Sequence, residues 1–149
     1  ITNQFRDRLH GCFTRHNLDA NEYCLILSRL QEQDYLQVNL LADVFLDTFT
    51  WSGGITALKA IACNLPIVTC PGETMRSRHS YGILKMLGVA ETIASTPATY
   101  IEIAVNLYLN PEFRKNIISR MQQQLNYLYD DTSCVIALEN FYKNVVDSL

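Results

Sequence analysis

Apolar residues along this chain follow two spacings, one typical of helices and one typical of buried strands. Phe5, Leu9 and Phe13 recur at helical spacing, which predicts a helix over residues 3–16. Three short apolar runs have the length of strands instead, at residues 23–30, 44–49 and 66–70. They are apolar throughout, as strands are when helices cover both faces of a parallel sheet.

Helices are predicted between these strands, over residues 31–43 and 55–63, with Asn64 ending the second of them. Strands and helices that alternate in this way indicate right-handed βαβ units. We therefore predict an α/β fold with a Rossmann-like parallel sheet and flanking helices. A further strand is expected near residues 92–94, and so thin a sheet suggests that upstream strands are missing from this chain.

The second half of the chain is predicted to be almost entirely helical. Helices are expected over residues 77–87, 97–109, 111–128 and 133–147. Residues 1–149 are interpreted as a single lobe, truncated at its N-terminal side, with C-terminal helices over about residues 97–147. The last helix has one apolar face, which is expected to pack on the local core or on another lobe; it carries Val135, Leu138, Tyr142 and Val145.

Composition excludes several classes of protein. Hydrophobic residues make up 48% of the chain and charged residues 18%, which is typical of a compact domain. A net charge of −3, with scattered lysine and arginine, argues against nucleic-acid binding. No apolar run approaches the length of about 20 residues that a membrane span needs. Five widely spaced cysteines, an odd number without a CxxC pair, indicate reduced thiols and a cytoplasmic protein.

The turn after the second predicted strand is the most informative stretch. Gly53 and Gly54 lie between that strand and the start of a helix. Glycine lets a ligand approach the backbone closely, and the free amides of a first helical turn favour a phosphate. The alternative is a plain tight turn in which Ser52 caps the helix. From these residues alone, the two interpretations are about equal.

Four motifs in register shift the balance toward phosphate binding. They are Leu41-Ala-Asp-Val-Phe-Leu-Asp-Thr48, Gly53-Gly-Ile-Thr56, Leu65-Pro-Ile-Val-Thr69 and Pro71-Gly-Glu-Thr-Met-Arg-Ser-Arg78. In this order and spacing they closely resemble the carboxyl-terminal lobe of the O-linked N-acetylglucosamine transferase family, which includes SPINDLY-like members. The resemblance covers about residues 4–145. It implies one lobe of a two-lobed, GT-B type glycosyltransferase.

The resemblance implies a UDP-sugar donor and transfer of N-acetylglucosamine to serine or threonine of a protein acceptor. Transfer would proceed with inversion and without a metal or other cofactor. Residues of this chain correspond to family positions that bind the donor: Gly53, Gly54, Ile55 and Thr56 at the diphosphate, Tyr35 stacked on the uracil, and Arg29 and Leu30 at its edge. No catalytic residue can be assigned, so we expect the fragment to bind donor without transferring the sugar.

Two positions depart from the family pattern. Ile55 replaces a threonine or asparagine, which removes a side-chain donor but keeps the amide. Lys59 replaces an acidic residue that accepts hydrogen bonds from the ribose, and lysine has only donors. Lys59 is expected to reach the diphosphate instead; the alternatives are weakened ribose recognition and a lysine that faces solvent. Tyr35, taken alone, fits a helix residue packed on the sheet better than a ring stacked on a base.

Other polar residues are expected to have structural roles. Glu73 is predicted to pair with an arginine of its own loop, and no role is assigned to His79. Asp43 and Asp47 are too isolated to form a metal motif and fit polar contacts at strand ends. Cys12 and His16 lie one turn apart, but no second ligand pair accompanies them, so no metal site is predicted.

Three functions stay open at this point. The first is the donor lobe of a protein glycosyltransferase. The second is the same lobe in a bacterial transferase that acts on a lipid or polysaccharide. The third is a degenerate lobe kept as an interaction module, which Ile55 and Lys59 motivate.

Overall fold

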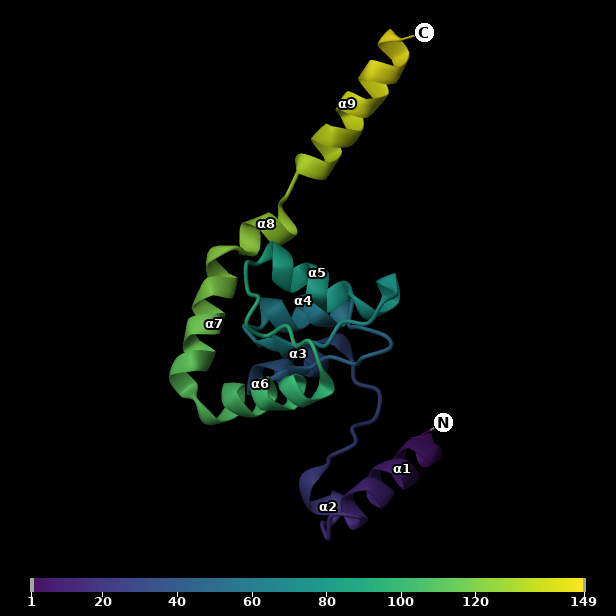
Figure 1. The fold of residues 1–149 in the computed structure, drawn as a ribbon, viewed down its shortest axis with the longest axis vertical. Helices are drawn as coiled ribbons and strands as arrows, with labels where there is room; N and C mark the ends of the chain where they lie inside the picture. The colour runs from purple at the N-terminus through teal and green to yellow at the C-terminus, as the bar shows by residue number, and fades with distance from the viewer. Residues whose placement is uncertain (1, 149) are drawn as a thin grey trace. The chain divides into compact units, whose positions relative to one another are not determined.

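The computed structural model describes residues 2–148 (Figure 1). They form two compact units, and the boundary along the chain falls between Glu32 and Gln33. The first unit contains α1 (Thr2–Thr14) and α2 (Ala20–Tyr23). The rings of Phe13 and Tyr23 stack with their centroids 5.9 Å apart, which joins the two helices. The helix predicted over residues 3–16 is therefore confirmed, and it ends two residues earlier.

The strand predicted over residues 23–30 is wrong for this structure. Tyr23 ends α2, and residues 24–31 form neither helix nor strand. A strand exists only through ladder hydrogen bonds to a neighbour, and this segment has no such partner among the described residues. Its apolar side chains are not buried either, since Leu25 is 85% exposed.

The second unit is built on a small parallel sheet. β1 (Phe45–Leu46) pairs with β2 (Ile67–Val68), with Phe45 opposite Ile67. A parallel bridge between Thr69 and Ile93 extends the pairing to the region where a further strand was expected. The predicted strands at 44–49 and 66–70 are thus confirmed in place and direction, although each is shorter than its apolar run.

Helices surround this sheet and account for most of the second unit (Figure 1). Their bounds are α3 (Glu32–Leu41), α4 (Ile55–Ala62), the 3-10 helix η1 (Met75–Ser77), α5 (His79–Met86), α6 (Pro97–Leu109), α7 (Pro111–Gln123), α8 (Leu125–Tyr129) and α9 (Ser133–Asp147). The predicted helix over 77–87 begins as a separate 3-10 turn. The one over 111–128 is divided at Gln124, whose N–H bonds to the Met121 carbonyl three residues earlier.

Local sequence explains where these helices begin and end. Asn64 and Gly88 follow α4 and α5 with positive φ angles of 59° and 65°, a conformation that asparagine and glycine tolerate best. Thr96 and Asn110 cap α6 and α7 by accepting a hydrogen bond from the third residue on. Each of these two helices also has proline at its first position, where the missing N–H costs nothing.

The core lies between α4, β2 and the helices that follow. Ala57, Ala60 and Ile61 of α4 are fully buried against Ile67 and Val68 of β2. The remaining large buried side chains come from α5, α6 and α7, and include Leu84, Leu107, Ile117 and Met121. Because one face of α4 is held in this core, its first turn has a defined position at the carboxyl end of β1.

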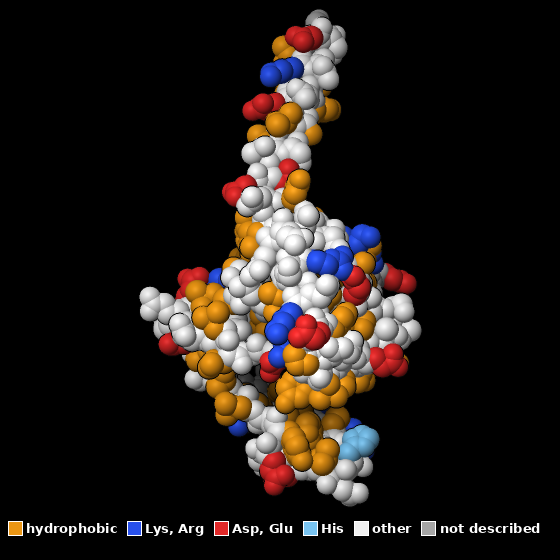
Figure 2. Space-filling view, turned by 90° about the vertical axis from the view of Figure 1, so that its left-hand side faces the viewer, with side chains coloured by type: hydrophobic (Ala, Val, Ile, Leu, Met, Phe, Trp, Pro, Cys, Tyr) orange, Lys and Arg blue, Asp and Glu red, His pale blue; other side chains and the backbone are white. Residues whose placement is uncertain are grey.

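The last helix is an exception to this packing. Every described residue of α9 is exposed, including the predicted apolar face, where Leu138 is 53% and Tyr142 59% exposed. Figure 2 shows hydrophobic and charged side chains side by side along α9, at the top of the view. Packing of this face on the local core, one of the two expected arrangements, is therefore wrong. None of the described helices is long and apolar enough to cross a membrane.

Candidate functional site

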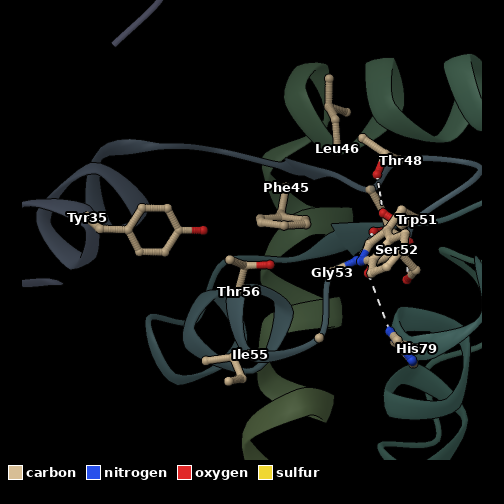
Figure 3. Close-up of a pocket in the computed structure, with 12 residues that line it drawn as sticks. Tyr35, Phe45, Leu46, Thr48, Trp51, Ser52, Gly53, Ile55, Thr56 and His79 are labelled. Atoms are coloured by element: carbon tan, nitrogen blue, oxygen red, sulfur yellow. Dashed lines mark hydrogen bonds between the residues drawn. The ribbon is translucent and has the colours of Figure 1, made fainter. Parts of the chain in front are cut away.

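A pocket of about 540 Å³ lies where β1 ends and α4 begins (Figure 3). Its wall includes five residues that the sequence predicted for the donor site, namely Tyr35, Gly53, Gly54, Ile55 and Thr56. The rest of the wall comes from β1, the loop after it and α5, and includes Asp47, Thr48, Trp51, Ser52 and His79. The carboxyl end of a parallel strand is the usual place for a ligand in an open α/β sheet.

The buried carboxylate of Asp47 organises the loop before α4. Asp47 is 3% exposed and follows β1 directly. Its Oδ1 accepts a hydrogen bond from the Gly53 amide at 2.8 Å. Its Oδ2 accepts from the hydroxyls of Ser52 at 2.8 Å and Thr69 at 2.7 Å. These bonds tie the loop to the ends of both strands, which agrees with the polar strand-end contacts predicted for Asp47.

Ser52 connects this loop to α5 and does not cap α4. Its Oγ accepts from the Ser80 amide at 2.8 Å, and its own amide donates to the Arg76 carbonyl at 2.8 Å. The cap of α4 is Gly54, which makes no side-chain hydrogen bond to the helix. The alternative in which Ser52 caps the helix is therefore wrong. No cap side chain accepts a hydrogen bond from the N–H groups in the first turn of α4, so these donors can bind a ligand.

The two glycines differ in the space that a Cβ would have at each position. A Cβ on Gly53 would lie 2.9 Å from Thr56 Oγ1 and 3.3 Å from Phe45 Cζ, so only glycine fits without displacement. A Cβ on Gly54 would meet only His79 Nδ1 at 3.8 Å, an ordinary contact. Because the Gly53 amide is bound to Asp47, Gly53 belongs to the pocket wall, and the uncapped amides begin at Gly54.

Tyr35 and the three predicted donor residues outside the pocket wall lie in three different places. Tyr35 belongs to α3, and Figure 3 shows its ring across the pocket from Ser52, with the hydroxyl directed toward the side of Phe45 and Thr56. Lys59 is half-buried on α4 but does not line this pocket. Arg29 and Leu30 belong to the first compact unit, so their placement at the uracil edge stays a prediction.

A tyrosine from α6 supports the same loop from the other side. The Tyr100 hydroxyl donates to the Asp47 carbonyl at 3.0 Å, and its ring meets Phe49 edge-to-face at 5.0 Å. Burial, with the Asp47 carboxylate and Cys70 nearby, raises the pKa of Tyr100 to about 12. The hydroxyl therefore remains a protonated donor at physiological pH.

The charged residues in the loop after β2 do not form the Glu73–arginine ion pair that the sequence predicted. None of the ion pairs described for residues 2–148 contains Glu73, so the pairing predicted for it is wrong. Arg78 instead donates to the Gly72 carbonyl at 2.8 Å and lies over the Tyr81 ring at 4.4 Å. Arg76 lies over the ring of Trp51, 5.9 Å from its centroid. Arg76 thus contacts one residue of the pocket wall, Trp51, whereas Arg78 and its two partners lie outside that wall.

Three pocket residues escaped the sequence reasoning. Trp51 lies in the loop between two recognised motifs and Thr48 is the last residue of the first of them, and the Thr48 hydroxyl donates to the Trp51 carbonyl. His79 begins α5, 25 residues beyond Gly54 in the chain, and only the fold brings the two together. Within residues 2–148 no three His, Cys, Asp or Glu side chains gather into a potential metal site, and Asp43 pairs with Arg114 at 3.3 Å.

Comparison with known proteins gives a consistent result. The profile of glycosyl transferase family 41 matches residues 9–133. A probable SPINDLY UDP-N-acetylglucosamine–peptide N-acetylglucosaminyltransferase of Petunia hybrida is 23% identical over 94% of this chain and 15% of its own length. The Caenorhabditis elegans UDP-N-acetylglucosamine–peptide N-acetylglucosaminyltransferase is 32% identical over 60% of this chain and 8% of its own length.

A solved structure agrees with these relatives. A mutant O-GlcNAc transferase of Thermobaculum terrenum superposes with a TM-score of 0.78 at 27% identity, covering 93% of this chain and 27% of that one. The chain therefore spans a small part of the length of each of these proteins. The family profile covers most of this chain, including all four motifs and every residue of the pocket wall. The chain belongs to glycosyl transferase family 41.

Proposed function

We propose that this chain is the UDP-sugar-binding lobe of an inverting, metal-independent glycosyltransferase of the Rossmann-like GT-B type. The full protein would transfer N-acetylglucosamine to serine or threonine of a protein acceptor in the cytoplasm. Membership of family 41 supports this class of reaction. The names of the relatives, which are peptide N-acetylglucosaminyltransferases, support the donor and the kind of acceptor.

One observation carries the proposal: Tyr35 and the uncapped start of α4 line the same pocket. A first helical turn offers several N–H donors and about half a positive elementary charge to a diphosphate. An aromatic ring can stack on a uracil face. A nucleoside diphosphate needs both features at once, with the base at one end of the site and the phosphates at the other.

Titration calorimetry with UDP, ADP and NAD tests this function. We expect binding that is selective for UDP, because the family resemblance implies contacts to the uracil edge as well as to the phosphates. Equal affinity for UDP and ADP would contradict the assignment of a uracil site. Absence of binding by all three ligands would favour the interaction module, which the departures at Ile55 and Lys59 motivate.

Tyr35→Ala is expected to weaken UDP binding by about 1–3 kcal/mol, because it removes the ring that would stack on the base. Tyr35→Phe keeps the ring and should retain most of the affinity. Tyr127→Ala is a matched control, since Tyr127 is 64% exposed on α8 and outside the pocket. Calorimetry on the three variants checks this, and unchanged affinity in Tyr35→Ala would remove Tyr35 from the site.

A further inference from the structure

The sequence motifs assign no role to His79. It is the first residue of α5, and its half-buried ring lines the pocket at the start of α4. It also lines a second hollow of about 590 Å³ between α4 and α5, together with residues such as Met75 and Tyr81. Gly54 and His79 are the two residues that the pockets share.

The ring is directed at the backbone where α4 begins. His79 Nδ1 lies 3.4 Å from the Ser52 carbonyl oxygen, as the dashed line in Figure 3 marks. It also lies 3.8 Å from the point where a Cβ of residue 54 would stand. Because residue 54 is glycine, no side chain separates the imidazole from the first turn of α4. The ring therefore borders the space in front of the uncapped amides.

The surrounding charges leave His79 available to an anion. The Asp47 carboxylate is already bound by Ser52, Gly53 and Thr69. The neighbouring Arg78 is directed at the Gly72 carbonyl and the Tyr81 ring. No ion pair described for residues 2–148 contains His79. A histidine can carry a positive charge near neutral pH, and a charge-assisted hydrogen bond to phosphate is stronger than a neutral one.

We propose that His79 is a donor-binding residue that contacts the diphosphate of the nucleotide, opposite the amides of α4. This proposal rests on the UDP-sugar function and adds an imidazole side chain from α5 to it. The diphosphate would then be held between α4 and α5. Ser52 connects the loop before α4 to α5, since it bonds both to Asp47 and to the Ser80 amide of α5.

Titration calorimetry of UDP and uridine with His79→Ala tests the contact. We expect the variant to bind UDP at least about tenfold more weakly, the loss of a single charged contact, and to bind uridine as the parent does. His79→Gln should fall between the two, because the amide donates a hydrogen bond without charge. His16→Ala is the control, since His16 is exposed in the other compact unit.

Two results would overturn the proposal while leaving the UDP site intact. One is a parent protein and His79→Ala with equal affinity for UDP. The other is an equal loss for UDP and uridine, which would mean that His79 only shapes the pocket. A parent protein that binds no UDP would overturn the proposed function as well. NMR of the unmodified protein gives a readout without substitution: the His79 ring signals should shift with UDP and not with uridine.

Discussion

Replacing Gly53 with alanine is expected to abolish most donor binding and to destabilise the fold. The added Cβ would stand 2.9 Å from Thr56 Oγ1 and 3.3 Å from both Ala57 Cβ and Phe45 Cζ. We expect relief of these contacts to displace the Thr56 side chain and shift the first turn of α4, at a cost of about 1–3 kcal/mol in the free energy of unfolding. UDP affinity should fall at least about tenfold, because the first-turn amides move with the helix.

Gly82 provides the matched control for this prediction. It lies inside α5, and a Cβ there would meet nothing within 4 Å. Alanine in the interior of a helix is better than glycine by up to about 1 kcal/mol, so Gly82→Ala should raise the free energy of unfolding. Urea unfolding and UDP calorimetry on both variants measure the difference. Equal stability of the two variants would contradict the crowding inferred at Gly53.

Asp47→Ala is expected to have the larger effect on stability. The substitution removes the acceptor of the Ser52 hydroxyl, the Thr69 hydroxyl and the Gly53 amide. A buried donor left without a partner costs about 1–3 kcal/mol, so a total loss of about 3 kcal/mol or more is expected. Since a domain of this kind is stable by only about 5–15 kcal/mol, such a loss would lower the urea midpoint strongly.

Asp43→Ala tests whether this effect belongs to the network at Asp47 and not to any aspartate near β1. Asp43 pairs with Arg114 at 3.3 Å, and its side chain is 48% exposed. A surface ion pair of this kind contributes at most about 1 kcal/mol. Urea unfolding should therefore separate the two alanine variants by at least about 2 kcal/mol. A smaller separation would mean that water replaces the Asp47 carboxylate without cost.

The bounds of two C-terminal helices were predicted correctly. The helices over 97–109 and 133–147 have the predicted bounds, and the first begins at a proline that Thr96 caps. Strand prediction was less accurate, because an apolar run does not show which other segment will pair with it as a strand. Residues 44–49 find β2 as a partner, whereas residues 23–30 find none among the described residues.

The pocket shows the same division. Adjacent glycines between a strand and a helix are a local feature, and the sequence was sufficient to select them. The choice between Ser52 as a helix cap and Ser52 as a bridge to α5 was not local. It depends on the Ser80 amide, 28 residues further along the chain. Likewise, Glu73 lies near arginines in the sequence, which suggested an ion pair. In the structure Arg78 donates to a backbone carbonyl instead.

The residue order alone was enough to indicate the family, to predict the alternation of helices with short parallel strands, and to select the loop that is proposed to meet the ligand. These properties depend on spacing along the chain, which the sequence states directly. Folding determined which polar groups meet: Asp47 with Thr69, Ser52 with Ser80, and His79 with Gly54. Contacts between residues more than 20 positions apart depend on how α4 and α5 pack against the sheet, and no local pattern encodes that geometry.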